Sequence, residues 1–306
     1  MEWSEATCYL NGEWRPLAQA TVPVLDRGFI FGDGVYELVP VDTVDGIRAP
    51  FRAREHCERL QRSCDGIGLA NPYSTERWLD LIDEIVERHP WPRQSVYFQV
   101  TRGVARRDHA FPAGVAPTVF ICSGPWAPIA AEQIERGVAV VTHADERWLH
   151  CDIKSISLLG NVLMKQHAVE RGAFETVMLR DGFLTEASSA NVMVVRDGRL
   201  LAPRPSRQIL PGITCDASFA LAQEHGLPLE LRPVSEAELR SADELWLSSS
   251  GREVLPITLL DGQPVGDGRP GPLFQRMRDW FGAAKRSEAQ RWRERRSQRH
   301  PGARAA

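Results

Sequence analysis

The chain has 306 residues, of which 43% are apolar and 25% charged, and it is long enough to build one large hydrophobic core or two smaller ones. Glycine and proline make up about 15% of the residues, which excludes collagen-like and low-complexity chains. No apolar run reaches the roughly 18 residues of a membrane helix, and residues 1–5 lack a basic-then-apolar signal pattern. We therefore expect a cytoplasmic protein with no membrane partner.

The net charge of −3 hides a basic C-terminal segment. Residues 283–306 hold eight Lys or Arg against two Glu, so the rest of the chain is acidic. A basic tail can bind nucleic acid, but here Trp292 is its only aromatic residue and the body repels phosphate. We expect a disordered tail and no nucleic-acid partner.

Strand and helix patterns alternate in residues 1–123, which we expect to form a small α/β N-terminal domain. The alternation of apolar residues predicts strands at 9–15, 18–24 and 95–102, with a turn at Asn11-Gly12, and helices at 52–64 and 75–87. Three glycines between residues 28 and 34 have the spacing G-x-x-x-G-x-G. This spacing differs from the dinucleotide fingerprint, so we reject a dinucleotide site.

Residues 124–128 are rich in proline and glycine and predict a linker to a larger domain at 129–282. In that domain we expect strands at 137–143, 175–179, 190–195 and 245–248, and helices at 161–171, 215–225 and from the Ser235–Glu238 capping box. The six cysteines are scattered without zinc-ligand spacing. They predict reduced thiols and no metal site.

Only three of the 37 basic residues are lysines: Lys154, Lys165 and Lys285. Lysine can lose its proton and act as a nucleophile, whereas arginine stays charged. Lys285 lies in the tail, and Lys165 lies in a polar amphipathic stretch where it is expected to face water. Lys154 is predicted at a strand end or turn beside buried positions, which makes it the candidate for amine chemistry.

Four further features could hold a flat ligand that carries a phosphate. Glu186 precedes a run of small residues, and a carboxylate buried there can pair with a protonated ring nitrogen. The turn at Gly212 enters a predicted helix whose first amides suit a phosphate, and the Ser248–Gly251 loop and Arg59 can add donors. Each signal alone is more often a surface feature. Together with a lysine, they are the attachments that pyridoxal phosphate requires.

Six segments resemble the fold-type IV pyridoxal-phosphate enzymes, and among these most of all the D-amino-acid aminotransferases. They occur in family order and spacing at residues 31–37, 55–60, 151–155, 158–161, 184–189 and 209–214. The resemblance covers roughly residues 8–282. It implies an α+β fold with a small N-terminal domain, a larger C-terminal domain with a barrel-like β core, and the cofactor between them.

The resemblance also implies the roles of individual residues. Lys154 would hold the cofactor as a Schiff base and shuttle the proton at the substrate Cα. Glu186 would keep the pyridine nitrogen protonated, and Leu210 would pack on one ring face. The residues expected to grip the phosphate are Arg59, Ile213, Thr214 and Ser250.

The substrate class depends on how the α-carboxylate is held. Arg107 and His109 resemble the D-specific carboxylate trap, which the family completes with a tyrosine matching Tyr36. In the family this loop reaches in from the neighbouring subunit, so a homodimer with a shared active site is implied. The expected reaction is a ping-pong transamination between D-amino acids and pyruvate or 2-oxoglutarate.

Alternatives remain open on the same scaffold and outside it. A branched-chain L-aminotransferase, an (R)-amine transaminase and an aminodeoxychorismate lyase would share the cofactor residues and differ at the Arg107 loop. Residues 106–109 could also be an exposed, charged surface loop that binds no substrate. A non-catalytic module that binds phosphate ligands or nucleic acid would lack the covalent cofactor.

Overall fold

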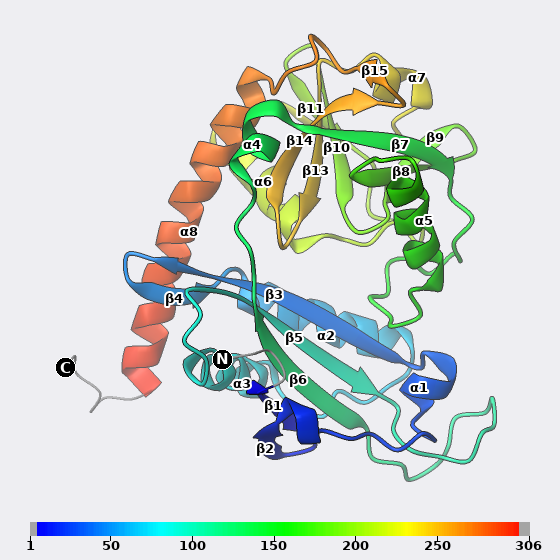
Figure 1. Cartoon of the computed structure of the whole chain (residues 1–306), viewed down its shortest axis with the longest axis vertical. Helices are drawn as coiled ribbons and strands as arrows, with labels where there is room; N and C mark the ends of the chain where they lie inside the picture. Colours follow the sequence, from blue (N-terminus) through cyan, green and yellow to red (C-terminus); the bar gives the residue numbers. More distant parts are fainter. Residues whose placement is uncertain (1–4, 300–306) are drawn as a thin grey trace. The chain divides into compact units, whose positions relative to one another are not determined.

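The computed structural model describes residues 5–299 and divides into two compact units. The N-terminal unit comprises Met1–Pro128, Ile153–Ser157 and Ala283–Ala306, and the C-terminal unit comprises Ile129–Asp152 and Leu158–Gly282 (Figure 1). Within residues 5–299, no helix is both long and apolar enough to cross a membrane.

The N-terminal unit is built on an antiparallel sheet with the strand order β2-β1-β6-β5-β3-β4. The strands are β1 (Thr7–Leu10), β2 (Glu13–Pro16), β3 (Gly34–Val44), β4 (Ile47–Pro50), β5 (Arg93–Thr101) and β6 (Thr118–Pro125). The helices are η2 (Leu17–Gln19), α1 (Arg27–Phe31), α2 (Ala53–Gly66) and α3 (Thr75–Glu87). The two long helices and the β5 strand confirm the sequence predictions.

The strand predicted at 18–24 is wrong. After Asn11-Gly12 the chain forms β2 and then enters η2 instead of a second long strand. Pro16 ends β2, and residues 18–24 are largely exposed. Alternating side chains do not make a strand where no neighbouring strand offers its backbone.

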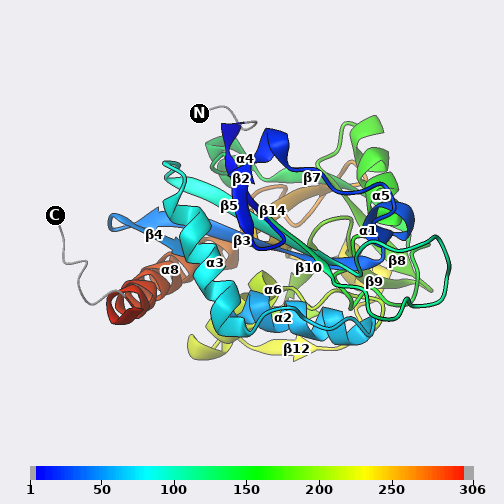
Figure 2. The same cartoon turned by 90° about the horizontal axis from the view of Figure 1, so that it is seen from below.

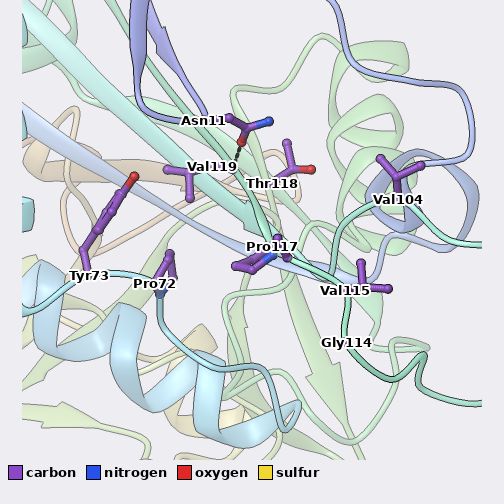
Figure 3. Close-up of a pocket in the computed structure, with 10 residues that line it drawn as sticks. Asn11, Pro72, Tyr73, Val104, Gly114, Val115, Pro117, Thr118 and Val119 are labelled. Carbon is purple, nitrogen blue, oxygen red and sulfur yellow. Dashed lines mark hydrogen bonds between the residues drawn. The ribbon is translucent and has the colours of Figure 1, made fainter.

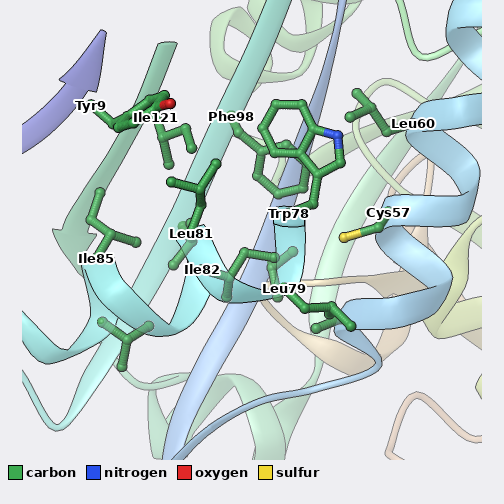
Figure 4. Close-up of a cluster of buried hydrophobic side chains, with 14 of the residues drawn as sticks. Tyr9, Cys57, Leu60, Trp78, Leu79, Leu81, Ile82, Ile85, Phe98 and Ile121 are labelled. Atoms are coloured by element: carbon green, nitrogen blue, oxygen red, sulfur yellow. The ribbon is translucent and has the colours of Figure 1, made fainter. Parts of the chain in front are cut away.

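Helices α2 and α3 cover one face of this sheet (Figure 2). The helical spacing of Trp78, Ile82 and Ile85 places all three on the buried face of α3. Trp78 stacks on Phe98 of β5 with ring centroids 5.1 Å apart (Figure 4). Each fully buried side chain of this size stabilises the fold by about 1.5–3 kcal/mol.

The C-terminal unit contains a curled sheet with the order β12-β11-β10-β13-β14-β7-β8-β9, to which β15 adds beside β14. Its strands are β7 (Val138–Ala144), β8 (Glu175–Arg180), β9 (Phe183–Ala187), β10 (Asn191–Arg196), β11 (Arg199–Ala202), β12 (Leu229–Leu231), β13 (Glu244–Ser249), β14 (Glu253–Leu260) and β15 (Gln263–Pro264). Strand β9, at one end of the order, lies against β10. This curl encloses an apolar core and confirms the predicted barrel-like domain.

Four helices belong to the C-terminal unit: α4 (Ala131–Arg136), α5 (Leu159–Glu170), α6 (Ile213–Glu224) and α7 (Glu236–Arg240). The capping box predicted at Ser235 and Glu238 is present at the start of α7. The last helix, α8 (Pro272–Arg299), contributes to both units.

The observed division differs from the predicted domains in two places. Strand β6 extends to Pro125, so the predicted linker 124–128 begins inside a strand. The segment Ile153–Ser157 belongs to the N-terminal unit, although the prediction placed it in the domain 129–282. Its backbone hydrogen bonds to β3 are the reason for this assignment.

The disorder expected for the basic tail is not found over residues 283–299, which lie in α8. Ala289 and Trp292 are buried in the core of the N-terminal unit. Asp80 of α3 forms ion pairs with Arg295 at 2.6 Å and with Arg299 at 3.0 Å. The tail charges are thus matched by acidic residues that lie some 200 positions earlier in the chain. The tail from residue 300 lies outside the described residues.

Candidate active site

Lys154 differs from the other two lysines in its surroundings. The amines of Lys165 and Lys285 lie 3.9 and 2.7 Å from carboxylate oxygens of Glu175 and Asp42. The amine of Lys154 lies instead 3.2 Å from the Tyr36 hydroxyl and 4.3 Å from the centre of that ring. No ion pair within residues 5–299 has to break before the Lys154 amine reacts.

The backbone around Lys154 is fastened to the start of β3. The amide of Tyr36 donates to the Lys154 carbonyl at 3.0 Å, and the amide of Ile156 donates to the Gly34 carbonyl at 3.1 Å. The Lys154 amide donates to the Ser63 hydroxyl of α2 at 3.1 Å. The predicted residues Lys154 and Tyr36 are therefore brought together by main-chain pairing.

Arg59 belongs to a buried cluster of charged groups in the same unit. Its Nε and Nη2 donate to the Glu37 carboxylate at 2.7 and 2.9 Å, and His56 Nδ1 lies 2.7 Å from the same carboxylate. Burial alone would raise the pKa of Glu37, but the Arg59 and His56 partners outweigh it and hold that pKa far below its usual range. Burial lowers the pKa of His56. Glu37 thus orients the Arg59 guanidinium.

Glu186 is buried in the C-terminal unit, at the end of β9. Its carboxylate accepts from Arg147 Nη1 at 2.6 Å, Asn191 Nδ2 at 3.2 Å and the Leu210 amide at 3.1 Å. Burial raises the pKa of Glu186 to about 7 in spite of the Arg147 charge. The protein groups alone therefore leave this carboxylate short of positive charge. A protonated ring nitrogen would supply that charge, so the donor set fits a pyridine cofactor.

Arg147 and its partner Asp145 were missed by the sequence reasoning. Two hydrogen bonds of 2.9 Å join the Arg147 guanidinium to the Asp145 carboxylate, which also accepts from the Thr185 hydroxyl at 2.8 Å. Burial would lower the pKa of Arg147, but the two carboxylates outweigh it and raise that pKa. Arg147 is one of 34 arginines in the chain, so its residue type gave no reason to select it. Only its buried position beside Asp145 and Glu186 distinguishes it.

Three predicted cofactor residues lie at the start of α6 or just before it. Ile213 and Thr214 form its first turn, and Leu210 is tied to Asn191 by a hydrogen bond of 2.9 Å from the Asn191 amide group. A Cβ at Gly212 would come within 1.9 Å of the side-chain oxygen Oδ1 of Asn191, so any other residue there would force Asn191 to move. The unpaired backbone N–H groups at the N-terminus of a helix of this length can donate hydrogen bonds to a phosphate.

The second predicted phosphate loop follows β13. Ser250 is half-buried beyond the strand end. The hydroxyl of Ser248, two residues earlier, is buried without a hydrogen-bond partner within the described part of the chain. A buried hydroxyl without a partner costs about 1–3 kcal/mol, which a bound oxygen ligand would offset. This orphaned hydroxyl supports a ligand at the loop.

Arg107 and His109 lie in the exposed loop between β5 and β6. The Arg107 guanidinium lies 5.3 Å and the His109 ring 5.5 Å from the centre of the Phe31 ring. The structure therefore brings the two predicted trap residues to one aromatic ring. Among the described residues, neither of them has a hydrogen bond or ring contact with Tyr36, whose ring packs instead on Tyr97.

A surface pocket of about 610 Å³ lies in the N-terminal unit, near the turn at Asn11 (Figure 3). Tyr73, Val104 and Pro117 are among the residues that line it. Its lining carries no amine, guanidinium or carboxylate, and none of the predicted site residues. The pocket is therefore not the candidate site for the reaction.

A family model described as amino-transferase class IV matches residues 34–260, about three quarters of the chain. The chain belongs to the class IV aminotransferases. A curated D-alanine aminotransferase from Staphylococcus aureus (strain MW2) is 38% identical over 273 residues, which cover 89% of this chain and 95% of that protein. The D-alanine aminotransferase from Bacillus licheniformis is 40% identical to this chain. The alignment covers 86% of this chain and 91% of the Bacillus enzyme.

Solved structures confirm the fold of this aminotransferase. A branched-chain amino acid aminotransferase of Escherichia coli has a TM-score of 0.86 at 26% identity and covers 91% of this chain and 94% of its own. A second branched-chain enzyme, from T.th. and solved with pyridoxamine 5'-phosphate, has a TM-score of 0.89 at 25% identity, over 95% and 98%. Class IV aminotransferases use pyridoxal phosphate, and this chain is a pyridoxal-phosphate enzyme.

The pKa of Glu186 generates a prediction for the cofactor-free protein. The folded chain keeps the Glu186 proton up to about pH 7, whereas the unfolded chain releases it near the ordinary value of 4.5. The free energy of unfolding should therefore fall as the pH rises between these values, by up to about 3 kcal/mol. Glu186→Gln should lose this slope in denaturant titrations at pH 5 and pH 8. Glu224→Gln, an exposed carboxyl on α6, should keep it, and equal slopes in all three proteins would contradict the assignment.

Proposed function

We propose that this aminotransferase moves amino groups between D-amino acids and a 2-oxo acid, pyruvate or 2-oxoglutarate, by a ping-pong mechanism. The observation that carries the proposal is 38–40% identity, over most of both chains, to enzymes named D-alanine aminotransferase. The branched-chain enzymes among the solved structures share only 24–26%. Their names nevertheless favour a branched-chain L-aminotransferase as the second candidate.

We propose that pyridoxal phosphate is held by the residues that the sequence predicts for it. Lys154 is the point of covalent attachment and moves the proton at the substrate Cα. Glu186 holds the protonated pyridine nitrogen, and Leu210 packs on the ring. The remaining residues hold the phosphate: Arg59, Ile213, Thr214 and Ser250. When bound, pyridoxal phosphate supplies the electron sink for the pair released at Cα.

The α-carboxylate of the substrate is assigned to Arg107, His109 and Tyr36. A guanidinium and an imidazole N–H bind a carboxylate by charge-assisted hydrogen bonds, which are stronger than neutral ones. Binding the carboxylate at a fixed place relative to the Lys154 amine would fix which face of the Cα carries the hydrogen. This placement is the proposed basis of selectivity for D-amino acids.

A homodimer with a shared active site is part of the proposal. Pairing of Asp26 with Val104, and of the Arg27 amide with the Gly103 carbonyl at 2.9 Å, lays residues 24–29 beside the Arg107 loop. Large apolar side chains are exposed on this surface: Val24, Leu25, Phe29, Val104 and Phe111. An exposed apolar patch of this kind marks an interface, and a second copy of the chain is its proposed partner.

The cytoplasm is the proposed compartment. All six cysteines are buried and free of disulfide bonds. Reduced cysteines are typical of a reducing compartment.

Covalent attachment at Lys154 is tested by borohydride reduction of the holoenzyme and peptide mapping. The cofactor tag is expected on Lys154, because the other two lysines are in ion pairs. Lys165→Arg is the matched control and should keep the tag and the colour, whereas Lys154→Arg should lose both while keeping the charge. A tag on Lys165, or none, would refute the assignment.

Substrate class is tested with purified enzyme, D-alanine and 2-oxoglutarate, by following pyruvate. We expect turnover with D-alanine and little with L-leucine. Arg107→Ala should raise the KM for D-alanine at least about tenfold, since a charge-assisted hydrogen bond contributes roughly 1.5–3 kcal/mol. Activity with L-leucine alone would assign the enzyme to the branched-chain class instead.

The shared site is tested by coexpressing Lys154→Ala and Arg107→Ala with different tags and assaying at D-alanine concentrations well below the KM of Arg107→Ala, where both variants are impaired. A loop that serves the neighbouring subunit gives each mixed dimer one complete site. With random pairing this restores about a quarter of wild-type activity. If the loop serves its own subunit, the mixed dimers should be no more active than the separate variants.

A further inference from the structure

Asp33 holds two arginines at the base of the loop that carries Arg107 and His109. Its carboxylate accepts from Arg27 Nε at 2.7 Å and from Arg102 Nε at 2.8 Å. Arg27 and Arg102 are both buried. Burial would raise the pKa of Asp33, but its two arginine partners outweigh it and lower that pKa. One carboxylate thus fixes the planes of two guanidinium groups.

The two Nη nitrogens of Arg27 are not bound to Asp33. They point instead at the backbone of the Arg107 loop. Nη1 donates to the carbonyl of Asp108 at 2.5 Å and to that of Ala110 at 3.4 Å, and Nη2 donates to the His109 carbonyl at 3.5 Å. Asp108 lies between the two trap residues in sequence, and His109 is one of them. The Arg102 guanidinium, in contrast, donates to carbonyls of residues 67 and 68.

Phe31, on the same helix as Arg27, completes the support. The Arg27 guanidinium lies 4.9 Å from the centre of the Phe31 ring, which is also the ring that Arg107 and His109 approach. A cation near an aromatic face gains roughly 0.5–1 kcal/mol at an exposed site. Helix α1 therefore supports both the backbone and the side chains of the loop.

We propose that Arg27 is the positioning residue of the carboxylate-binding pair Arg107 and His109, an inference that rests on the proposed function. Both trap residues are exposed, and the loop has neither helix nor strand to hold it. An arginine side chain carries about 2 kcal/mol of rotamer entropy, which weakens binding unless the site is organised beforehand. The three carbonyl hydrogen bonds of Arg27 provide that organisation.

Positioning predicts a specific kinetic pattern. Losing Arg27 should weaken the binding of every carboxylate ligand, whether amino donor or 2-oxo acceptor. Arg27 is not among the residues assigned to the cofactor or to proton transfer, so kcat at saturating substrate should change little. A group that merely stabilised the fold would lower the amount of active enzyme and leave the KM unchanged.

The test compares the wild-type holoenzyme with Arg27→Lys and with Arg48→Lys. Lysine keeps the charge but cannot bind Asp33 and three carbonyls at once. Arg48 is the matched control, because it also binds backbone carbonyls and a carboxylate, Glu87, in the same unit. We expect Arg27→Lys to raise the KM for D-alanine and the Kd for propionate, measured by calorimetry, about tenfold. Arg48→Lys should leave both constants unchanged.

If Arg27→Lys does not fold, Phe31→Leu takes its place, because it removes the ring and keeps the Arg27 hydrogen bonds. A rise of about threefold in both constants is then expected. Unchanged constants in a folded Arg27→Lys, or a loss of kcat alone, would overturn the inference while D-alanine turnover by the wild type upholds the proposed function. A wild type inactive on D-alanine would refute the proposed function, and propionate binding by the variants would still decide the role of Arg27.

Discussion

The return of the chain to β3 at Ile153–Ser157 is the constraint on which the position of Lys154 depends. Strand β5 pairs with β3 along its length, but β4 pairs only with Val41–Val44. The other edge of β3 is thus left open beside Gly34 and Tyr36, and an open edge offers unpaired amides and carbonyls. Ile153–Ser157 satisfies them and carries the Lys154 amine to the Tyr36 ring. The side chain of Lys154, which lies outside any helix or strand, thereby gains a defined position.

Buried arginine–carboxylate groups set the remaining geometry. Glu37, Glu186 and Asp33 each accept a hydrogen bond from an arginine side chain. Arginine stays charged at any pH and presents its donors in a rigid fork, so a carboxylate on one side aims the nitrogens on the other. This explains the use of arginine at buried sites in a chain with only three lysines. The partial exception is Glu186, whose raised pKa indicates that its charge is not fully balanced by protein groups.

Local patterns predicted most elements because their apolar spacing matches the face that each element buries. Helix α3 is an example, since the residues that repeat at helical spacing are the ones packed against the sheet. The same reasoning failed for residues 18–24, which alternate but have no strand beside them. It also failed for the tail, where Arg295 and Trp292 have partners in the N-terminal unit that sequence separation concealed.

The sequence by itself determined the family and the cofactor chemistry, because ordered motifs of fixed residue type and spacing are enough to specify them, and it predicted Lys154 among three lysines. Only the tertiary structure shows which side chains hydrogen-bond to the predicted site residues and fix their positions. Arg27 and Arg147 are two of 34 arginines, so residue type alone does not distinguish them in the sequence. Their roles arise from burial next to a partner of opposite charge brought in by another element, and a pairing between distant segments leaves no local periodicity in the sequence.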